Sequence, residues 1–171
     1  TRGEGGQNAV GPVGDVLRGV RSRETEEAAR FLDVGLQFLD LPDFGYCRTA
    51  AEAMDRWSAL APDQHIADAI AAFAPDLVCT PHGPLEAHGQ KRALFLLLQR
   101  VLSKKGAPPF LRHALVDEKA QVEIGLEAID LLHGKSYRET AYEALLFHKS
   151  QQPHDPTDQS SPRQLRLRFE G

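Results

Sequence analysis

The apolar and polar positions in the first part of the chain follow two different spacings. From Val16 to Leu32, apolar side chains recur at helical intervals, which predicts an amphipathic helix after a Gly-rich opening. The run VGLQFLDL (34–41) predicts a strand instead. The sequence PDFG (42–45) has the composition of a turn, so we expect Asp43 to lie on a loop at the end of that strand.

Two helices and a second strand are predicted in the middle of the chain. Thr49 is a suitable N-cap for a helix through Leu60, and Pro62 suits the first turn of a helix that ends near Phe73. The short run DLVCT (76–80) predicts a buried parallel strand, because it is mainly apolar and contains β-branched residues.

A loop with two histidines follows this strand and leads into a predicted helix over residues 90–103. The loop contains His82, Glu86 and His88. Ligands of open parallel sheets bind beyond the carboxyl ends of the strands, so this loop is a candidate functional site. Two imidazoles and a carboxylate also match the three protein ligands of a hydrolytic zinc. Spacing alone leaves open the alternative that both histidines only bond the backbone or cap the next helix.

The last part of the chain predicts further strands and one helix. FLRHALV (110–116) predicts a strand, and a capping box at Ser136 opens a helix that we expect to run through Gln151. Residues 152–164 are rich in proline, serine, aspartate and glutamine and predict a flexible loop, whereas LRLRF (165–169) alternates like an edge strand. The alternation of helical and extended segments along the chain predicts an α/β fold.

Composition narrows the class of protein and its partners. The 171 residues, 42% of them hydrophobic, are enough for a single domain over 1–171. Twenty Lys and Arg against 24 Asp and Glu give a net charge of −4, which argues against nucleic acid or a membrane surface and favours a small-molecule partner.

The sequence also predicts a soluble, cytoplasmic protein. No apolar run reaches the roughly 20 residues of a membrane span, and the start lacks the layout of a signal peptide. Cys47 and Cys79 lie too far apart in the sequence for a chelating pair, and Cys79 falls in the predicted buried strand. A reducing compartment is therefore expected.

Several motifs resemble those of the PIG-L/LmbE-type deacetylases. TRGEGGQN (1–8) is similar to the Gly-rich loop after the second strand of that family, and PHGPLEAHGQKRA (81–93) is similar to the loop that carries its His-x-x-His pair. The Arg21-x-x-Glu24 pair, LDLPDFGY (39–46) and HKSQ (148–151) also resemble family motifs. Together these matches span most of the chain.

The resemblance implies a Rossmann-like, three-layer fold with a mainly parallel sheet. It also implies zinc-dependent removal of the acetyl group from an N-acetylglucosamine-type sugar conjugate. His88 matches the first histidine of the pair, which implies a catalytic role in polarising the amide or protonating the leaving amine. Asn8, Arg21 and Asp43 are implied to contact the substrate. The first strands and the His-Pro-Asp-Asp segment, which carries two zinc ligands and the base, are expected upstream of Thr1.

Lys91 departs from the family pattern, because it occupies the position of the second histidine of the pair. An ammonium group has no lone pair for a metal, so zinc is implied by the resemblance while the metal ligands in this chain stay unassigned. The alternative is a catalytically inactive sugar-binding or scaffold domain that has lost the metal site. Both functions are compatible with retained substrate contacts.

Some of these residues also have a purely structural interpretation. Arg21 and Glu24 also suit an exposed ion pair one helical turn apart, and Asp43 also suits a turn. Oligomerisation is left open by the sequence. A sheet without its first strands would expose an apolar edge, so we expect a stable monomer only with an upstream segment or a partner that covers that edge.

Overall fold

The computed structural model describes residues 1–8, 11, 13–114, 118–151 and 164–170. The chain divides into two compact units, which we describe separately. Unit 1 comprises residues 1–45 and 124–165, and unit 2 comprises residues 46–123 and 166–171. The single domain expected from the sequence therefore stays a prediction.

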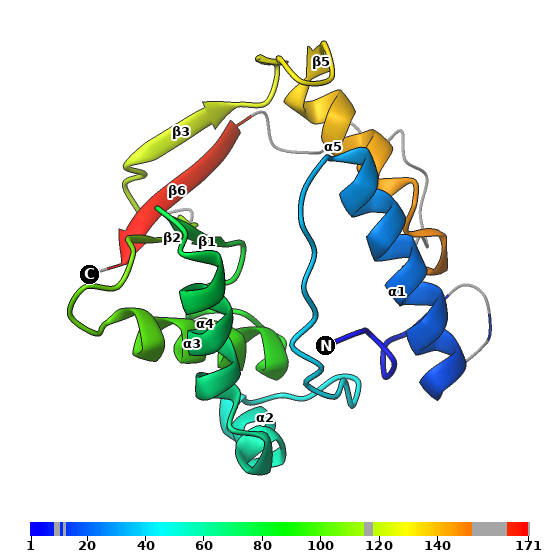
Figure 1. The fold of residues 1–171 in the computed structure, drawn as a ribbon, viewed down its shortest axis with the longest axis vertical. Coiled ribbons are helices and arrows are strands. Elements are labelled where there is room, and N and C mark those ends of the chain that lie inside the picture. The colour runs from blue at the N-terminus through cyan, green and yellow to red at the C-terminus, as the bar shows by residue number, and fades with distance from the viewer. Residues whose placement is uncertain (9–10, 12, 115–117, 152–163, 171) are drawn as a thin grey trace. The chain divides into compact units, whose positions relative to one another are not determined.

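The chain contains both helices and strands, which confirms the α/β class (Figure 1). In chain order the elements are α1 (Gly14–Phe31), α2 (Ala50–Trp57), the 3₁₀-helix η1 (Ser58–Leu60), α3 (Pro62–Phe73), β1 (Val78–Thr80), α4 (Gly89–Leu102), β2 (Phe110–His113), β3 (Val122–Gly125), β4 (Ile129–Asp130), β5 (Lys135–Ser136), α5 (Tyr137–Leu145), the 3₁₀-helix η2 (Lys149–Gln151) and β6 (Gln164–Glu170). None of the helices in the described ranges combines the length and the apolar character that a membrane span requires.

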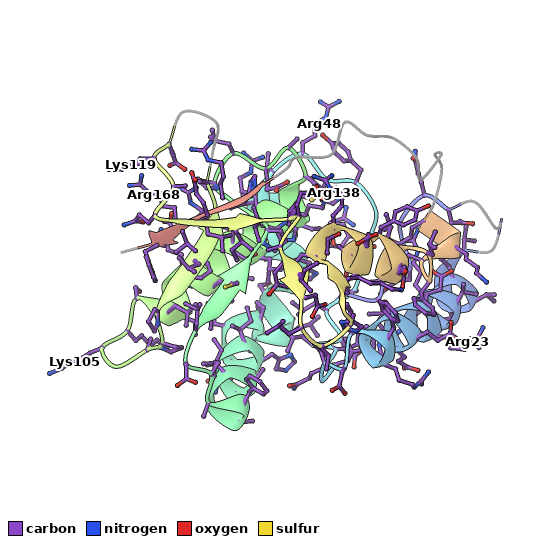
Figure 2. All side chains as sticks on the ribbon, turned by 90° about the horizontal axis from the view of Figure 1, so that it is seen from above. Arg23, Arg48, Lys105, Lys119, Arg138 and Arg168 are labelled. Carbon is purple, nitrogen blue, oxygen red and sulfur yellow. The ribbon has the colours of Figure 1, made fainter. Side chains whose placement is uncertain are left out.

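Helix α1 of unit 1 is the amphipathic helix that the sequence predicts. Its buried positions include Leu17, Arg21, Glu24 and Ala28, which recur every three or four residues and so share one face of the helix. Arg23 is exposed, and its side chain extends away from the helix (Figure 2). Helices α1 and α5 lie side by side (Figure 1). The buried face of α1 thus carries two charged side chains as well as apolar ones.

The predicted strand over residues 34–41 is wrong, because this segment has no regular secondary structure. Within the described ranges no strand pairs with it, and a strand needs such a neighbour to satisfy its backbone groups. Asp40 has a positive φ of 54°, which also interrupts an extended backbone. The Asp40 carboxylate instead binds the guanidinium groups of Arg2 and Arg18. Hydrogen bonds from these two groups, Arg2 foremost, lower the pKa of Asp40 to about 2.

Helix α5 begins with the predicted capping box and ends earlier than expected. The Ser136 side chain accepts from the Glu139 backbone N–H, and the Glu139 carboxylate accepts from the Ser136 backbone N–H. The helix ends at Leu145 rather than at Gln151, where the sequence analysis placed its end. The Ser150 N–H donates to Glu24 of α1, which removes it from the backbone pattern of a continuing helix.

A short hairpin of β4 and β5, which the sequence analysis missed, holds His133 against the end of α1. The His133 Nδ1 lies 2.6 Å from Asp130 Oδ2, and its Nε2 lies 2.9 Å from the carbonyl oxygen of Phe31. Both ring nitrogens thus face oxygen acceptors, and only the protonated ring donates from both. The bond to Phe31 and then the bond to Asp130 raise the pKa of His133, while partial burial and the charge of Lys135 oppose them.

We expect His133 to make the stability of unit 1 depend on pH. Its pKa is higher in the folded than in the unfolded state, so its contribution is fully present below the unfolded value of 6.5. The contribution is lost as the pH rises through the folded pKa. Urea unfolding between about pH 5 and pH 9 should show this decline in the wild type and not in His133→Gln. The exposed His65 provides a control, and equal pH profiles for wild type and His133→Gln would contradict the assignment.

Unit 2 contains most of a four-stranded mixed sheet with the order β1-β2-β6-β3. Strand β1 is parallel to β2, with Val78 opposite Phe110, and β6 is antiparallel to β2. Strand β6 lies between β2 and β3, so its predicted place at the edge is wrong. Cys79 is exposed rather than buried, because side chains alternate along a strand and the next residue of β1, Thr80, takes the buried face. The mainly parallel, Rossmann-like sheet remains a prediction.

The helices of unit 2 match their predicted ranges closely. Thr49 caps α2 by accepting from the Glu52 backbone N–H, and Pro62 lies in the first turn of α3. Trp57 at the end of α2 is 2% exposed. Helix α4 packs on the sheet, where the Phe95 and Phe110 rings lie 6.0 Å apart.

Two sequence predictions lie partly outside the described residues. The predicted strand over 110–116 is confirmed for Phe110–His113 and ends before Ala114, while residues 115 and 116 lie outside the described ranges. The predicted loop over 152–164 lies outside them except for Gln164, which begins β6.

Candidate functional site

The Gly-rich segment of unit 1 forms a tight turn packed against the PDFG segment. The Gly6 N–H donates to the Gly3 carbonyl over 3.2 Å, and Gly3 has a φ of 73°, which favours glycine. A Cβ atom on Gly5 would lie 2.3 Å from the Gly45 nitrogen and 2.6 Å from the Asp43 carbonyl oxygen. Only glycine therefore fits this close approach of two backbone segments.

Arg21 projects from α1 into this turn and is 7% exposed. Its Nη1 donates to the Gly3 carbonyl and its Nη2 to the Gln7 carbonyl. Its Nε is buried and has no hydrogen-bond partner among the described residues. The guanidinium fork thus joins both ends of the Gly-rich turn to the helix.

Glu24 lies one turn further along α1 and binds a different segment. Its carboxylate accepts from the Ser150 backbone N–H at 2.7 Å and from the Ser150 hydroxyl at 2.6 Å. Glu24 is 8% exposed and Ser150 is 0% exposed. The interpretation of Arg21 and Glu24 as an exposed ion pair is therefore wrong, because both side chains are buried and each bonds elsewhere. Sequence reasoning missed Ser150 as a partner, although the HKSQ motif marked its position.

Asn8 and Asp43 both fix local turns in unit 1. The Asp43 Oδ1 accepts from the Gly45 N–H at 2.8 Å, and Gly45 has a φ of 79°, which confirms the predicted turn. The Asn8 Oδ1 accepts from the Gly11 N–H at 2.6 Å. The structure brings Asn8, Arg21 and Asp43 to the same Gly-rich region of unit 1. Their roles as substrate contacts stay predictions.

His88 belongs to unit 2, where it stands at the N-cap position of α4. Its ring packs edge-on against the exposed Tyr46 ring at 5.3 Å, and its Nδ1 is buried without a hydrogen-bond partner in the described ranges. The next residue, Gly89, donates its N–H to the Cys47 carbonyl over 2.8 Å. The His88 ring is thus held by packing rather than by a polar partner on Nδ1.

His82 and Glu86 form a loose pair within the same loop. Their Nδ1 and Oε1 atoms are 3.6 Å apart, and burial lowers the pKa of His82 despite the nearby carboxylate. Neutral imidazole is the form that this environment favours.

A comparison with protein families identifies the chain. The model of the PIG-L family, described as GlcNAc-PI de-N-acetylase, matches residues 1–96. The chain belongs to the PIG-L family. Its match covers the Gly-rich turn, Arg21, Asp43 and His88, so the family resemblance seen in the sequence is confirmed. Comparisons with curated proteins and with solved structures found no match. Membership of the PIG-L family suggests a deacetylase-like function.

The PIG-L family is generally metal-dependent, so the described residues have to be tested against a metal. They contain no group of three or more His, Cys, Asp or Glu side chains that could hold a metal ion. Lys91, at the second histidine position, is exposed and offers no lone pair. The described residues therefore do not fit a zinc site by themselves, and zinc ligands remain unassigned.

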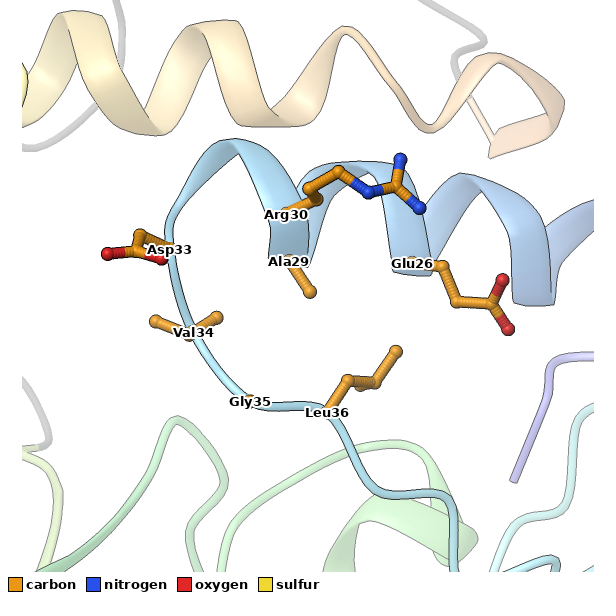
Figure 3. A pocket seen from close by; sticks show the side chains of 7 residues that line it. All are labelled: Glu26, Ala29, Arg30, Asp33, Val34, Gly35 and Leu36. Atoms are coloured by element: carbon orange, nitrogen blue, oxygen red, sulfur yellow. The ribbon is translucent and has the colours of Figure 1, made fainter.

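Two surface depressions lie among the described residues, one on each unit, and neither contains the substrate contacts predicted in unit 1. A depression of about 610 Å³ on unit 1 lies between α1 and the segment after it, where Ala29 and Leu36 face the same space (Figure 3). It is lined by Glu26, Ala29, Arg30, Asp33, Val34, Gly35 and Leu36. A smaller depression of about 210 Å³ on unit 2 includes Glu86 of the histidine loop. Asn8, Arg21 and Asp43 line neither.

Proposed function

We propose that the chain binds an N-acetylglucosamine-type sugar conjugate and takes part in removing its acetyl group. The ordered Gly-rich turn carries the proposal, since Arg21 holds it on one side and the PDFG turn packs against it on the other. Such a turn presents backbone groups to a ligand without a large ordering cost on binding. The PIG-L family match over residues 1–96 supports the reaction class.

Each candidate residue has a chemical role in this proposal. The Asp43 carboxylate accepts hydrogen bonds from sugar hydroxyls, and the Asn8 amide donates to them. Deacetylation adds water to the acetyl carbonyl carbon, breaks the C–N bond and releases acetate and an amine. His88 is the side chain that we assign to protonate the departing amine. No step is assigned to a metal, because the described residues do not fit one.

Sugar binding without hydrolysis is the second candidate function. Lys91 favours it, because this residue replaces a histidine where the family resemblance implies a metal ligand. The Gly-rich turn and Asp43 serve this function equally well. Binding and acetate release therefore have to be measured on the same sample.

We expect the chain to bind methyl N-acetyl-α-glucosaminide and not methyl α-glucoside. Calorimetry measures binding, and proton NMR measures acetate release with added zinc and with a chelator. Asp43→Asn keeps an oxygen for the Gly45 N–H and removes the charge, so affinity should fall about tenfold, or about 1.4 kcal/mol, without loss of the turn.

A second variant tests the catalytic role of His88 separately from ligand binding. His88→Gln should lower acetate release about 10²–10⁴-fold and leave binding unchanged, with the exposed His65→Gln as control. Binding without acetate release under any metal condition would favour the sugar-binding function. Equal affinity for the two glycosides would contradict both proposed functions, deacetylation and sugar binding without hydrolysis.

A further inference from the structure

The Arg21-x-x-Glu24 pair occupies one buried face of α1, yet its two members bond to different segments. Arg21 binds the carbonyl groups of Gly3 and Gln7, which are 18 and 14 residues away in the sequence. Glu24 binds the backbone and side chain of Ser150, which is 126 residues away. The bonds formed by each side chain involve segments outside its own helix.

We infer that Arg21 and Glu24 are positioning residues that anchor two separate loops to one helix. Arg21 orders the Gly-rich turn, and Glu24 orders the turn at Lys149–Gln151. A ligand then meets the backbone of the Gly-rich turn and not the Arg21 guanidinium. This last step rests on the proposed sugar-binding function, whereas the anchoring itself does not.

Three observations around Arg21 support a positioning role over ligand contact. Both Nη atoms already donate to backbone carbonyls. The Nε atom is buried, so it does not face an open surface. Finally, a Cβ on Gly6 would lie 2.4 Å from Arg21 Nη1, and one on Gly3 would lie 2.7 Å from Arg21 Cδ. The glycines of the turn therefore leave the space that the Arg21 side chain fills.

The donors around Glu24 also match its side chain. Its two carboxylate oxygens are shared between the Ser150 N–H and the Ser150 hydroxyl, and Ser150 has no exposed surface. A buried carboxylate needs such donors, because it is otherwise costly to remove from water. The Ser150 hydroxyl and N–H supply two of them from one residue. A serine at this position thus matches the carboxylate of Glu24.

Amide hydrogen exchange on the ligand-free chain tests the two anchors independently. The reporters are the Gly6 N–H, which bonds the Gly3 carbonyl, and the Ser150 N–H, which bonds Glu24. Arg21→Lys replaces a two-armed fork with a single ammonium group, so we expect exchange at Gly6 to rise about tenfold with Ser150 unchanged. Glu24→Ala should raise exchange at Ser150 about tenfold and leave exchange at Gly6 unchanged. The exposed residues Arg23 and Glu27 on the same helix provide matched controls, Arg23→Lys and Glu27→Gln.

Conservative variants keep the test valid if Glu24→Ala does not fold. Glu24→Gln retains one acceptor for the Ser150 N–H and should restore most of its protection. Gly6→Ala should displace the Arg21 guanidinium and increase exchange at neighbouring turn amides as Arg21→Lys does. The double variant should then add no further increase, because the same contact has already been lost. Equal increases at both reporters in either single variant would overturn independent anchoring.

NMR of the Arg21 side chain with methyl N-acetyl-α-glucosaminide tests the ligand step. We expect the turn amides of residues 3–7 to shift on titration while the Arg21 Nε and Cζ signals stay in place. Shifted Arg21 signals, together with weaker binding by Arg21→Lys at unchanged Gly6 exchange, would make Arg21 a ligand contact and overturn the positioning role. Absence of glycoside binding by the wild type would refute the proposed function and the ligand step, while the exchange data would still decide the anchoring.

Discussion

Replacing Arg112 with alanine is expected to destabilise unit 2 by about 3–5 kcal/mol, because it leaves two carboxylates partly buried without their cation. Arg112 on β2 is 4% exposed. Both of its Nη atoms donate to Glu118 at 2.6 Å, and its Nε donates to Glu170 of β6. These bonds, that to Glu118 first, raise the pKa of the guanidinium.

Urea unfolding followed by the fluorescence of Trp57 measures this loss, since Trp57 is the single tryptophan and is buried in unit 2. Neutralising the partners as well, in Arg112→Met with Glu118→Gln and Glu170→Gln, should recover most of the stability. Arg166→Lys, on a partly exposed arginine, is the control. A loss below about 1 kcal/mol for Arg112→Ala would show that water reaches the carboxylates.

Replacing Gly89 with alanine is expected to distort the start of α4 and with it the place of His88. The added Cβ would lie 2.3 Å from the Thr49 carbonyl oxygen and 2.6 Å from Cys47 Sγ. Relief of these contacts has to stretch the bond from the Gly89 N–H to the Cys47 carbonyl. Overpacking of this kind costs about 1–3 kcal/mol.

Unfolding of Gly89→Ala by urea gives the stability change, and the His88 ring signals in NMR report whether the ring leaves Tyr46. Gly83→Ala in the same loop is the matched control, because its Cβ would meet only Arg112 Cδ, at an ordinary 3.7 Å. Wild-type stability and unchanged His88 signals in Gly89→Ala would show that the loop shifts without cost.

The helices were predictable because their signals are local. Thr49, Pro62 and Ser136 mark helix starts within a few residues of sequence, and the structure confirms all three. The prediction of a strand at 34–41 was wrong because an apolar pattern does not show whether a second strand is present to pair with it. Likewise, alternation within β6 does not reveal whether one or two neighbours pair with it, and that is decided by distant residues.

In the candidate site, too, the sequence pointed to individual residues but not to their bonding partners. The resemblance to a family motif singled out Arg21 and Glu24 together, but their bonds run to Gly3, Gln7 and Ser150. Nothing in an i, i+3 spacing on a helix distinguishes an exposed ion pair from two side chains that bind separate loops. His88 was singled out as a candidate because it follows a strand and matches a family histidine, whereas its contact with Tyr46 depends on packing.

The bond between Glu24 and Ser150 also bears on how the chain acquires its structure during synthesis. Helix α1 is synthesised before Ser150, whose two donors for the buried carboxylate lie 126 residues further along the chain. The length-dependent part of the entropy of closing such a loop comes to about 4 kcal/mol. Before Ser150 has been synthesised, burial of the Glu24 carboxylate lacks these donors and is costly, so we expect the buried face of α1 to pack fully only afterwards.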